Sequence, residues 1–255
     1  MAQAVPRFAE LPALPDWRTV DFISDLHLHE SEPATFEAWR TWMSATTADA
    51  VFILGDLFEV WVGDDAASAG FEARCTAVLR GTAARKPVFF MHGNRDFLVG
   101  RAFLAQLGIT LLDDPTVLVF AGSRWLLSHG DMLCLDDVDY LKFREEVRGP
   151  AWQGAFLSKP LAERRTVARA LREQSEARKH SGVTWADVDA QAARDWLQAS
   201  GAATLIHGHT HRPADHLLAD GQSRVVLSDW DLAAVPPRAQ VLRLTAAGLE
   251  RLPVA

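Results

Sequence analysis

The sequence predicts an α/β fold whose functional site is assembled from distant segments. Five short apolar runs, each typical of a buried strand, end in metal-binding residue types: DFISDLHLH at 21–29, VFILGD at 51–56, VFFMHGNRD at 88–96, WLLSHGD at 125–131 and LIHGHTH at 205–211. Open α/β sheets place their ligand sites at the carboxyl ends of their strands. We therefore expect folding to bring these five blocks to one edge.

The segments between these strands carry loop, helix and hairpin signals. Residues 1–17 contain three prolines and no strong period, which predicts a loose N-terminal extension. A loop at 63–70 precedes a predicted helix near 71–84, and a second helix near 97–107 is closed by Gly108. Thr184 is the expected cap of a later helix that returns the chain to the core. Residues 214–227, centred on Asp220-Gly221, and 239–254 are predicted to form two hairpins.

The candidate ligands offer imidazole nitrogens with carboxylate and amide oxygens, and no thiolate. They are Asp25, His27, Asp56, Asn94, His129, His207 and His209. This set suits Mn²⁺, Fe or Zn better than Ca²⁺ or a structural zinc site. Seven ligands are too many for one tetrahedral ion, so the count predicts two ions about 3.5–4 Å apart that share a bridging carboxylate. The other neighbouring histidines, His29, His92, His211 and His216, are expected to be supporting or loop residues.

The order D-x-H, GD, GN-x-D, H and GHTH resembles the calcineurin-like metallophosphoesterases. More closely, SDLHL, ILGDLFEVWVGDD, HGNRDFL, SHGDMLCLDD and LIHGHTHRPA are similar to the bacterial UDP-2,3-diacylglucosamine hydrolases of lipid A synthesis, over roughly residues 20–230. The resemblance implies a sandwich of two β-sheets flanked by helices. It divides the chain into a core at 18–136 and 184–255 and a helical insertion at 137–183, called the cap below.

The resemblance also implies the chemistry. Water would attack the α-phosphorus of the nucleotide-sugar lipid and release UMP and 2,3-diacylglucosamine 1-phosphate. Two Mn²⁺ ions are implied, one held by Asp25, His27 and His209 and the other by Asn94, His129 and His207, with Asp56 between them. A bridging hydroxide is the expected nucleophile, because two cations lower the pKa of a shared water.

Arg95 departs from the wider superfamily, where a histidine usually follows Gly-Asn and can protonate an alkoxide. Arginine stays charged and cannot act as that acid. A phosphate leaving group needs only a fixed cation, so Arg95 favours a pyrophosphate substrate and is predicted to be catalytic together with Asn94. The alternative is a salt bridge between Arg95 and Asp96.

The family's substrate contacts carry over in part. They fall on Asn94, Arg95, Asp137, Arg172, Ser175 and His207. The family's lysine would fall near Gly182, where this chain has none, and Lys179, one helical turn earlier, is the suggested replacement.

Composition limits the possible partners and compartment. With 255 residues, 49% of them hydrophobic, the chain is predicted to be one domain with an insertion. Cys75 and Cys134 give no disulfide framework, and no signal peptide or long apolar span is evident, so a cytoplasmic protein is expected. A net charge of −7 argues against nucleic acid as a partner. Nothing indicates a stable protein partner.

The charge is uneven, however. Residues 141–180 carry ten Lys/Arg and five acids, a net charge of +5 that leaves −12 for the rest. This helix-like segment either packs on its own domain with a solvated charged face or forms a cap that takes acyl chains. The second interpretation predicts peripheral binding to the anionic inner membrane of a Gram-negative bacterium. A soluble phosphatase and a non-catalytic binding module on the same scaffold are the competing functions.

Overall fold

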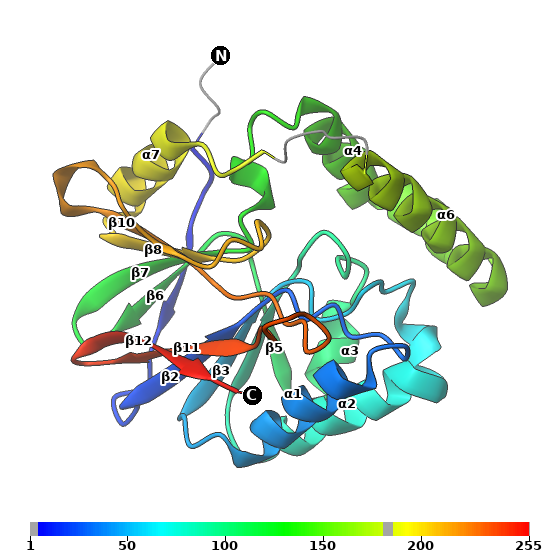
Figure 1. The fold of residues 1–255 in the computed structure, drawn as a ribbon, viewed down its shortest axis with the longest axis horizontal. Coiled ribbons are helices and arrows are strands. Elements are labelled where there is room, and N and C mark those ends of the chain that lie inside the picture. The colour runs from blue at the N-terminus through cyan, green and yellow to red at the C-terminus, as the bar shows by residue number, and fades with distance from the viewer. Residues whose placement is uncertain (1–4, 181–185, 255) are drawn as a thin grey trace.

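Two six-stranded β-sheets lie face to face, with helices on both outer sides (Figure 1). The computed structural model describes residues 5–180 and 186–254, and of residues 172–180 the helix backbone alone. The strand order is β12-β11-β2-β3-β4-β5 in the first sheet and β1-β6-β7-β8-β10-β9 in the second. The predicted α/β sandwich is confirmed.

The first sheet contains β2 (Thr19–Ile23), β3 (Ala50–Leu54), β4 (Val88–Met91), β5 (Ile109–Leu112), β11 (Gln240–Thr245) and β12 (Gly248–Pro253). Strands β2 to β5 run parallel, and β11 pairs antiparallel with both β2 and β12. Every residue of β3 and β4 is buried, because helices cover one face of this sheet and the second sheet covers the other. The continuous apolar runs in the sequence reflect this double burial.

The second sheet contains β1 (Ala9–Pro12), β6 (Thr116–Phe120), β7 (Ser123–Ser128), β8 (Thr204–His207), β9 (Asp215–Leu217) and β10 (Ser223–Val226). Strand β8 runs parallel to both β7 and β10. The turn between β9 and β10 is a 3₁₀ segment, η3 (Ala219–Gly221), at the predicted position. Both predicted hairpins, β9–β10 and β11–β12, are therefore present.

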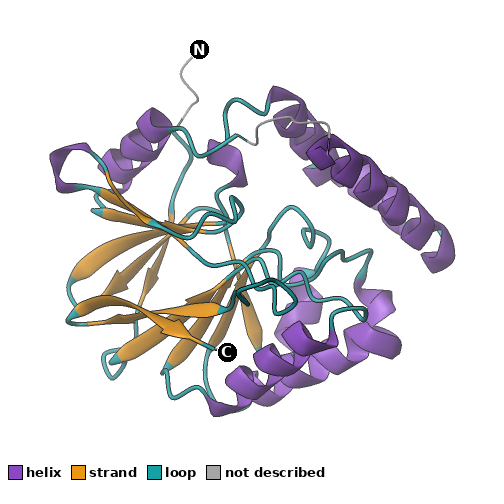
Figure 2. Cartoon of the chain, viewed as in Figure 1, coloured by secondary structure: helices purple, strands orange, loops and turns teal. Residues whose placement is uncertain are grey.

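Helices cover the sandwich on both sides (Figure 2). The first sheet is covered by α1 (Pro33–Ala45), α2 (Gly70–Ala83) and α3 (Arg101–Gln106), and the second by α7 (Ala190–Ser200). Between the sheets, Phe52 stacks on Phe89 with ring centroids 4.6 Å apart, and both belong to one buried cluster with Leu127 and Ile206 from the other sheet. Burial of these side chains fixes the two sheets relative to each other.

The N-terminal segment is not the loose extension that was expected. Residues 9–12 form edge strand β1, which pairs parallel with β6. Trp17 is buried and packs edge-to-face on Phe52 and Phe89. The open edge of β6 and the aromatic contact supply a tertiary partner that the segment's own period does not reveal.

Two helix boundaries also differ from the prediction. Helix α3 begins at Arg101 rather than near 97, because the preceding residues form a turn in which the Val99 amide donates to the Asp96 carbonyl. Helix α7 begins at Ala190, where the Asp189 side chain caps the Ala192 amide. The predicted cap residue Thr184 lies outside the described residues.

The cap projects from the sandwich beside the strand ends (Figure 1). It contains α4 (Val138–Arg148), α5 (Pro150–Leu157) and α6 (Leu161–His180). Trp152 stacks on buried Phe156 at 4.8 Å and contacts Phe97 of the core at 6.2 Å. In the part of the chain that the structure describes, no helix combines the length and apolar content needed to cross a bilayer.

Candidate metal centre

The predicted ligand blocks meet where strands of both sheets end. Register pairs Leu54 with Met91 in the first sheet and Ser128 with His207 in the second. The loops that follow are joined by backbone hydrogen bonds. The Asp25 amide donates to the Gly55 carbonyl at 3.1 Å, and the His27 amide to the Asp56 carbonyl at 3.0 Å. Across the second sheet, the Gly208 amide donates to the His129 carbonyl at 3.0 Å.

Several of these loop residues have a left-handed backbone. Asp25, His27, Asp56, His209 and His211 have φ between 47° and 68°. Such conformations cost about 1–3 kcal/mol each in a non-glycine residue and concentrate at functional sites. Close packing adds a second constraint, since a Cβ on Gly93 would lie 2.1 Å from Asp56 Oδ1. The chain therefore places side chains here at a conformational cost.

One group of donors consists of Asp25, His27 and His211. The Nε2 atoms of the two imidazoles are 3.1 Å apart. His211 Nε2 lies 3.5 Å from Asp25 Oδ1, and His27 Nε2 lies 3.9 Å from Asp56 Oδ2. The free donor atoms of two histidines thus converge on two carboxylates.

A second group adjoins the first. Asn94 Oδ1 lies 3.0 Å from His129 Nε2 and 2.9 Å from His209 Nδ1. His129 Nε2 is also 3.8 Å from Asp56 Oδ2. Asp56 is therefore near an imidazole of each group, as a carboxylate between two ions should be.

The described geometry leaves the assignment of the histidines to the two ions a prediction. His211 lies beside Asp25 and His27, and His209 Nδ1 lies 2.9 Å from Asn94 Oδ1. His207 is fully buried at the end of β8, and its Nδ1 lies 2.8 Å from the Gly208 carbonyl. Its Nε2 is buried with no hydrogen-bond partner among the described residues, which suits a metal ligand.

Of the four histidines expected to have supporting or loop roles, His211 lies beside the first group. None of the other three belongs to either group of donors. His29 contacts Ser31, His92 contacts the Val99 carbonyl and His216 lies on edge strand β9.

The electrostatics of the centre favour a bound cation. Burial opposes ionisation of Asp25, yet the hydrogen bond and charge of His211 hold its pKa below the usual value. Burial would lower the pKa of His129, but Asp56, Asp131 and Asp25 raise it to about 9. Among the described residues, no Lys or Arg side chain pairs with Asp25 or Asp56. Oxygen and imidazole donors around buried carboxylates that no Lys or Arg side chain neutralises fit divalent metals such as Mn²⁺, Fe and Zn.

Arg95 lies at the rim of the centre. Its amide donates to Asp56 Oδ1 at 2.8 Å, and its Nη1 lies 3.6 Å from Glu59 Oε1. The alternative salt bridge to Asp96 is not formed. Asp96 is fully buried and accepts the amides of Leu57 and Gly93 instead.

Among the predicted substrate contacts on the cap, Asp137 alone has a described side chain. Asp137 is the N-cap of α4 and accepts the Tyr140 amide at 3.1 Å. Arg172, Ser175 and Lys179 lie on α6, but their side chains are outside the described residues, as is Gly182. Their role in binding substrate stays a prediction.

Sequence reasoning missed the anchor of α4. Buried Asp131 accepts hydrogen bonds from Tyr140 Oη at 2.5 Å and Arg144 Nε at 2.7 Å. The Tyr140 ring in turn stacks on His209 at 6.0 Å. The first cap helix is thereby fixed against the second ligand group.

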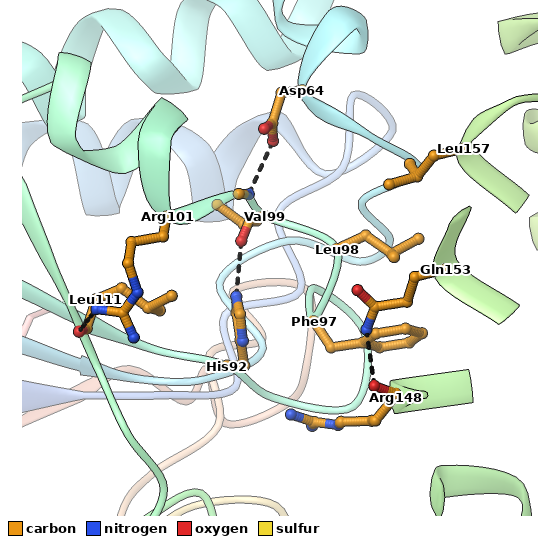
Figure 3. Close-up of a pocket in the computed structure, with 11 residues that line it drawn as sticks. Asp64, His92, Phe97, Leu98, Val99, Arg101, Leu111, Arg148, Gln153 and Leu157 are labelled. Carbon is orange, nitrogen blue, oxygen red and sulfur yellow. Dashed lines mark hydrogen bonds between the residues drawn. The ribbon is translucent and has the colours of Figure 1, made fainter. Parts of the chain in front are cut away.

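A cavity of about 420 Å³ lies between the core and the cap (Figure 3). Phe97, Leu98 and Leu157 supply apolar walls, and Arg148 supplies a cation. Arg148 also donates to the Gly93 carbonyl at 2.8 Å, next to candidate ligand Asn94. None of the predicted ligands lines the cavity, so it is a neighbour of the metal centre and not the centre itself.

Comparison with known proteins finds similar sequences over most of the chain. The calcineurin-like phosphoesterase family model matches residues 18–213. A Chromobacterium violaceum protein named UDP-2,3-diacylglucosamine hydrolase is 51% identical over 83% of this chain and 90% of its own. Proteins of the same name from Aromatoleum aromaticum and Xanthomonas campestris are 47% and 43% identical and cover 82% and 91% of this chain and 88% and 97% of their own. The solved structure of the E. coli phosphoesterase Yfce covers 92% of this chain and 93% of its own, with 15% identity and a TM-score of 0.48.

Proposed function

The chain belongs to the calcineurin-like phosphoesterase family and is a hydrolase, and from this premise we propose that it cleaves the pyrophosphate of UDP-2,3-diacylglucosamine. Water attacks the α-phosphorus, giving UMP and 2,3-diacylglucosamine 1-phosphate. The observation that carries the proposal is the pair of adjoining donor groups, one around Asp25 and one around Asn94, with Asp56 near an imidazole of each.

The two groups would hold two Mn²⁺ ions. Asp25, His27 and His209 would serve the first, Asn94, His129 and His207 would serve the second, and Asp56 would lie between them. When bound, such ions lower the pKa of the attacking water and offset charge on the phosphoryl oxygens. The protein fixes the donor atoms. His129 Nδ1 lies 2.9 Å from the Leu54 carbonyl, which directs the proton to Nδ1 and leaves Nε2 facing Asn94 and Asp56.

Arg95 would neutralise the departing phosphate. Its backbone amide donates to Asp56 Oδ1, so the Arg95 side chain extends from a position next to the candidate ligands. Because the leaving group is itself a phosphate, a fixed cation suffices and no proton donor is required.

The cap supports a lipid substrate. Val138, Phe143, Leu157 and Leu171 are 39–53% exposed on its helices, which also carry most of its cations. Acyl chains would cover the apolar side chains, and the cations would face the pyrophosphate and an anionic inner membrane to which the protein binds peripherally. Asp137, Arg172, Ser175 and Lys179 are the proposed cap contacts to the substrate.

Hydrolysis in ¹⁸O-labelled water tests the site of attack. Attack at the α-phosphorus places the label in UMP, and mass spectrometry of both products reads its position. Label in the lipid phosphate instead would show attack at the other phosphorus. Failure of the Mn²⁺-loaded protein to turn over the substrate would contradict the proposed function itself.

A further inference from the structure

Glu59 is a carboxylate outside the ligand set that faces two functional side chains. Its Oε2 lies 3.3 Å from His27 Nδ1, and its Oε1 lies 3.6 Å from Arg95 Nη1. The side chain is buried, with 9% of the residue exposed. One oxygen thus faces a metal-site imidazole and the other faces the guanidinium proposed to meet the phosphate.

The backbone around Glu59 is tied to both neighbours. Its amide donates to the Leu28 carbonyl at 3.2 Å, next to His27. Two residues later, the Trp61 amide donates to the Arg95 carbonyl at 3.0 Å. Glu59 therefore sits on a short segment bonded on one side to the His27 loop and on the other to the Arg95 loop.

A carboxylate in this position can act on the metal site through His27. A ligating imidazole offers one nitrogen to the metal, and an acceptor at its other nitrogen fixes its tautomer and ring orientation. In His27, Nε2 faces His211 and Asp56 while Nδ1 faces Glu59. This is the orientation that leaves Nε2 available for a metal.

The same carboxylate limits where the Arg95 guanidinium can go. An arginine has four side-chain torsions, and an opposite charge at one end of its fork reduces the conformations it samples. The Arg95 side chain is 18% exposed, so solvent screens this pair only in part.

We propose that Glu59 is a positioning residue that couples the orientation of metal ligand His27 to that of Arg95. The inference rests on the proposed function, because it takes His27 as a ligand and Arg95 as the phosphate-binding cation. It predicts that loss of Glu59 weakens one metal site and also removes part of the benefit that Arg95 supplies.

Asp229 provides an internal comparison. Its Oδ2 lies 4.0 Å from His211 Nδ1, and Arg238 holds it at 2.8 Å. It thus faces the other imidazole of the same donor group, but no contact joins it to Arg95 in the described part of the chain. Loss of Asp229 should therefore leave the contribution of Arg95 unchanged.

Titration of the metal-free protein with Mn²⁺, followed by calorimetry, tests the effect of Glu59 on the metal site without any substrate. Glu59→Ala should bind one of two ions about 10–100-fold more weakly, the range typical for loss of such a supporting partner. Glu59→Gln should recover part of this, because its amide oxygen can still accept from Nδ1–H. The matched control is Glu72→Ala, since Glu72 is also partly buried and paired with an arginine, Arg165, away from the centre.

A double-mutant cycle on kcat tests the coupling. If Glu59 positions Arg95, the loss in Glu59→Ala plus Arg95→Ala is smaller than the product of the single losses. For Asp229→Ala combined with Arg95→Ala, the loss in kcat should equal the product of the two single losses. Wild-type affinity for both ions in Glu59→Ala, or multiplicative losses with Arg95→Ala, would overturn the inference. Fewer than two ions on the wild-type protein would overturn the proposed function instead.

Discussion

The histidines after β8 complete the candidate metal centre. His207 ends the strand, and the left-handed backbone of His209 and His211 follows it. Asp25 and Asp56 were predicted from residue type and position after a buried strand, and they lie within the centre. The position of His211 beside Asp25 was not predicted, because HGHTH offers two pairs of histidines with the same spacing.

Substitution of single histidines tests the predicted assignment. His207→Ala should lose one Mn²⁺ per chain, because its Nε2 is buried without a hydrogen-bond partner among the described residues. His211→Ala should keep both ions, because His211 is expected to support Asp25 and not to bind an ion. Elemental analysis after dialysis measures the metal content. One ion in His211→Ala and two in His207→Ala would instead place His211 in the ligand set.

Arg95→Ala should lower kcat by about 10²–10³, the range for loss of one charge-stabilising donor, with little change in metal content. Arg95→Lys should recover only part of the rate, because an ammonium lacks the planar fork. Steady-state kinetics with Mn²⁺ in excess gives the comparison. An unchanged kcat in the alanine variant would show that the arginine serves structure alone.

At the level of elements, the cap is fastened to the core by a buried arginine. Arg164 is 3% exposed and donates to the Val62 carbonyl and to Asp65, on the loop that precedes α2. A Cβ on Gly63 would lie 2.2 Å from the same guanidinium, so this loop is shaped to receive it. The sequence showed that the cap is basic, but not that one of its cations is internal.

Arg164→Ala should lower the free energy of unfolding by about 1–3 kcal/mol, because it leaves a buried carbonyl without its charged donor. Arg165→Ala is the matched control. Arg165 is 50% exposed and lies 3.6 Å from Glu72, so its loss should cost about 0.5 kcal/mol or less. Urea denaturation of the three proteins measures the difference. Equal stabilities for both variants would contradict an anchoring role for Arg164.

Elements with strong local signals were predicted and elements defined by tertiary contact were not. The hairpins β9–β10 and β11–β12 carry their own turn chemistry and appear where expected. Strand β1 exists because β6 offers an open edge, and α7 starts late because Asp189 supplies the cap. These partners lie far away in sequence or compete with equally good local candidates.

In the whole molecule, acidic and basic residues are concentrated in different parts, and these parts have different proposed roles. The acidic sandwich holds the candidate ligands, and the basic cap stands beside them with apolar side chains both buried on the core and exposed. Trp152 and Phe156 pack on the domain, as the first interpretation of the cap predicts. Phe143, Leu157 and Leu171 are exposed, and their contact with acyl chains stays a proposal.

The central claim is that this metal centre acts on a diacylated nucleotide sugar. Burial of acyl chain contributes about 0.8 kcal/mol per methylene, so a few buried methylenes raise kcat/KM by more than about 100-fold. The most direct test is kcat/KM of the Mn²⁺-loaded protein on UDP-2,3-diacylglucosamine and on UDP-N-acetylglucosamine. We predict a far higher value for the acylated substrate, and equal values would contradict the account.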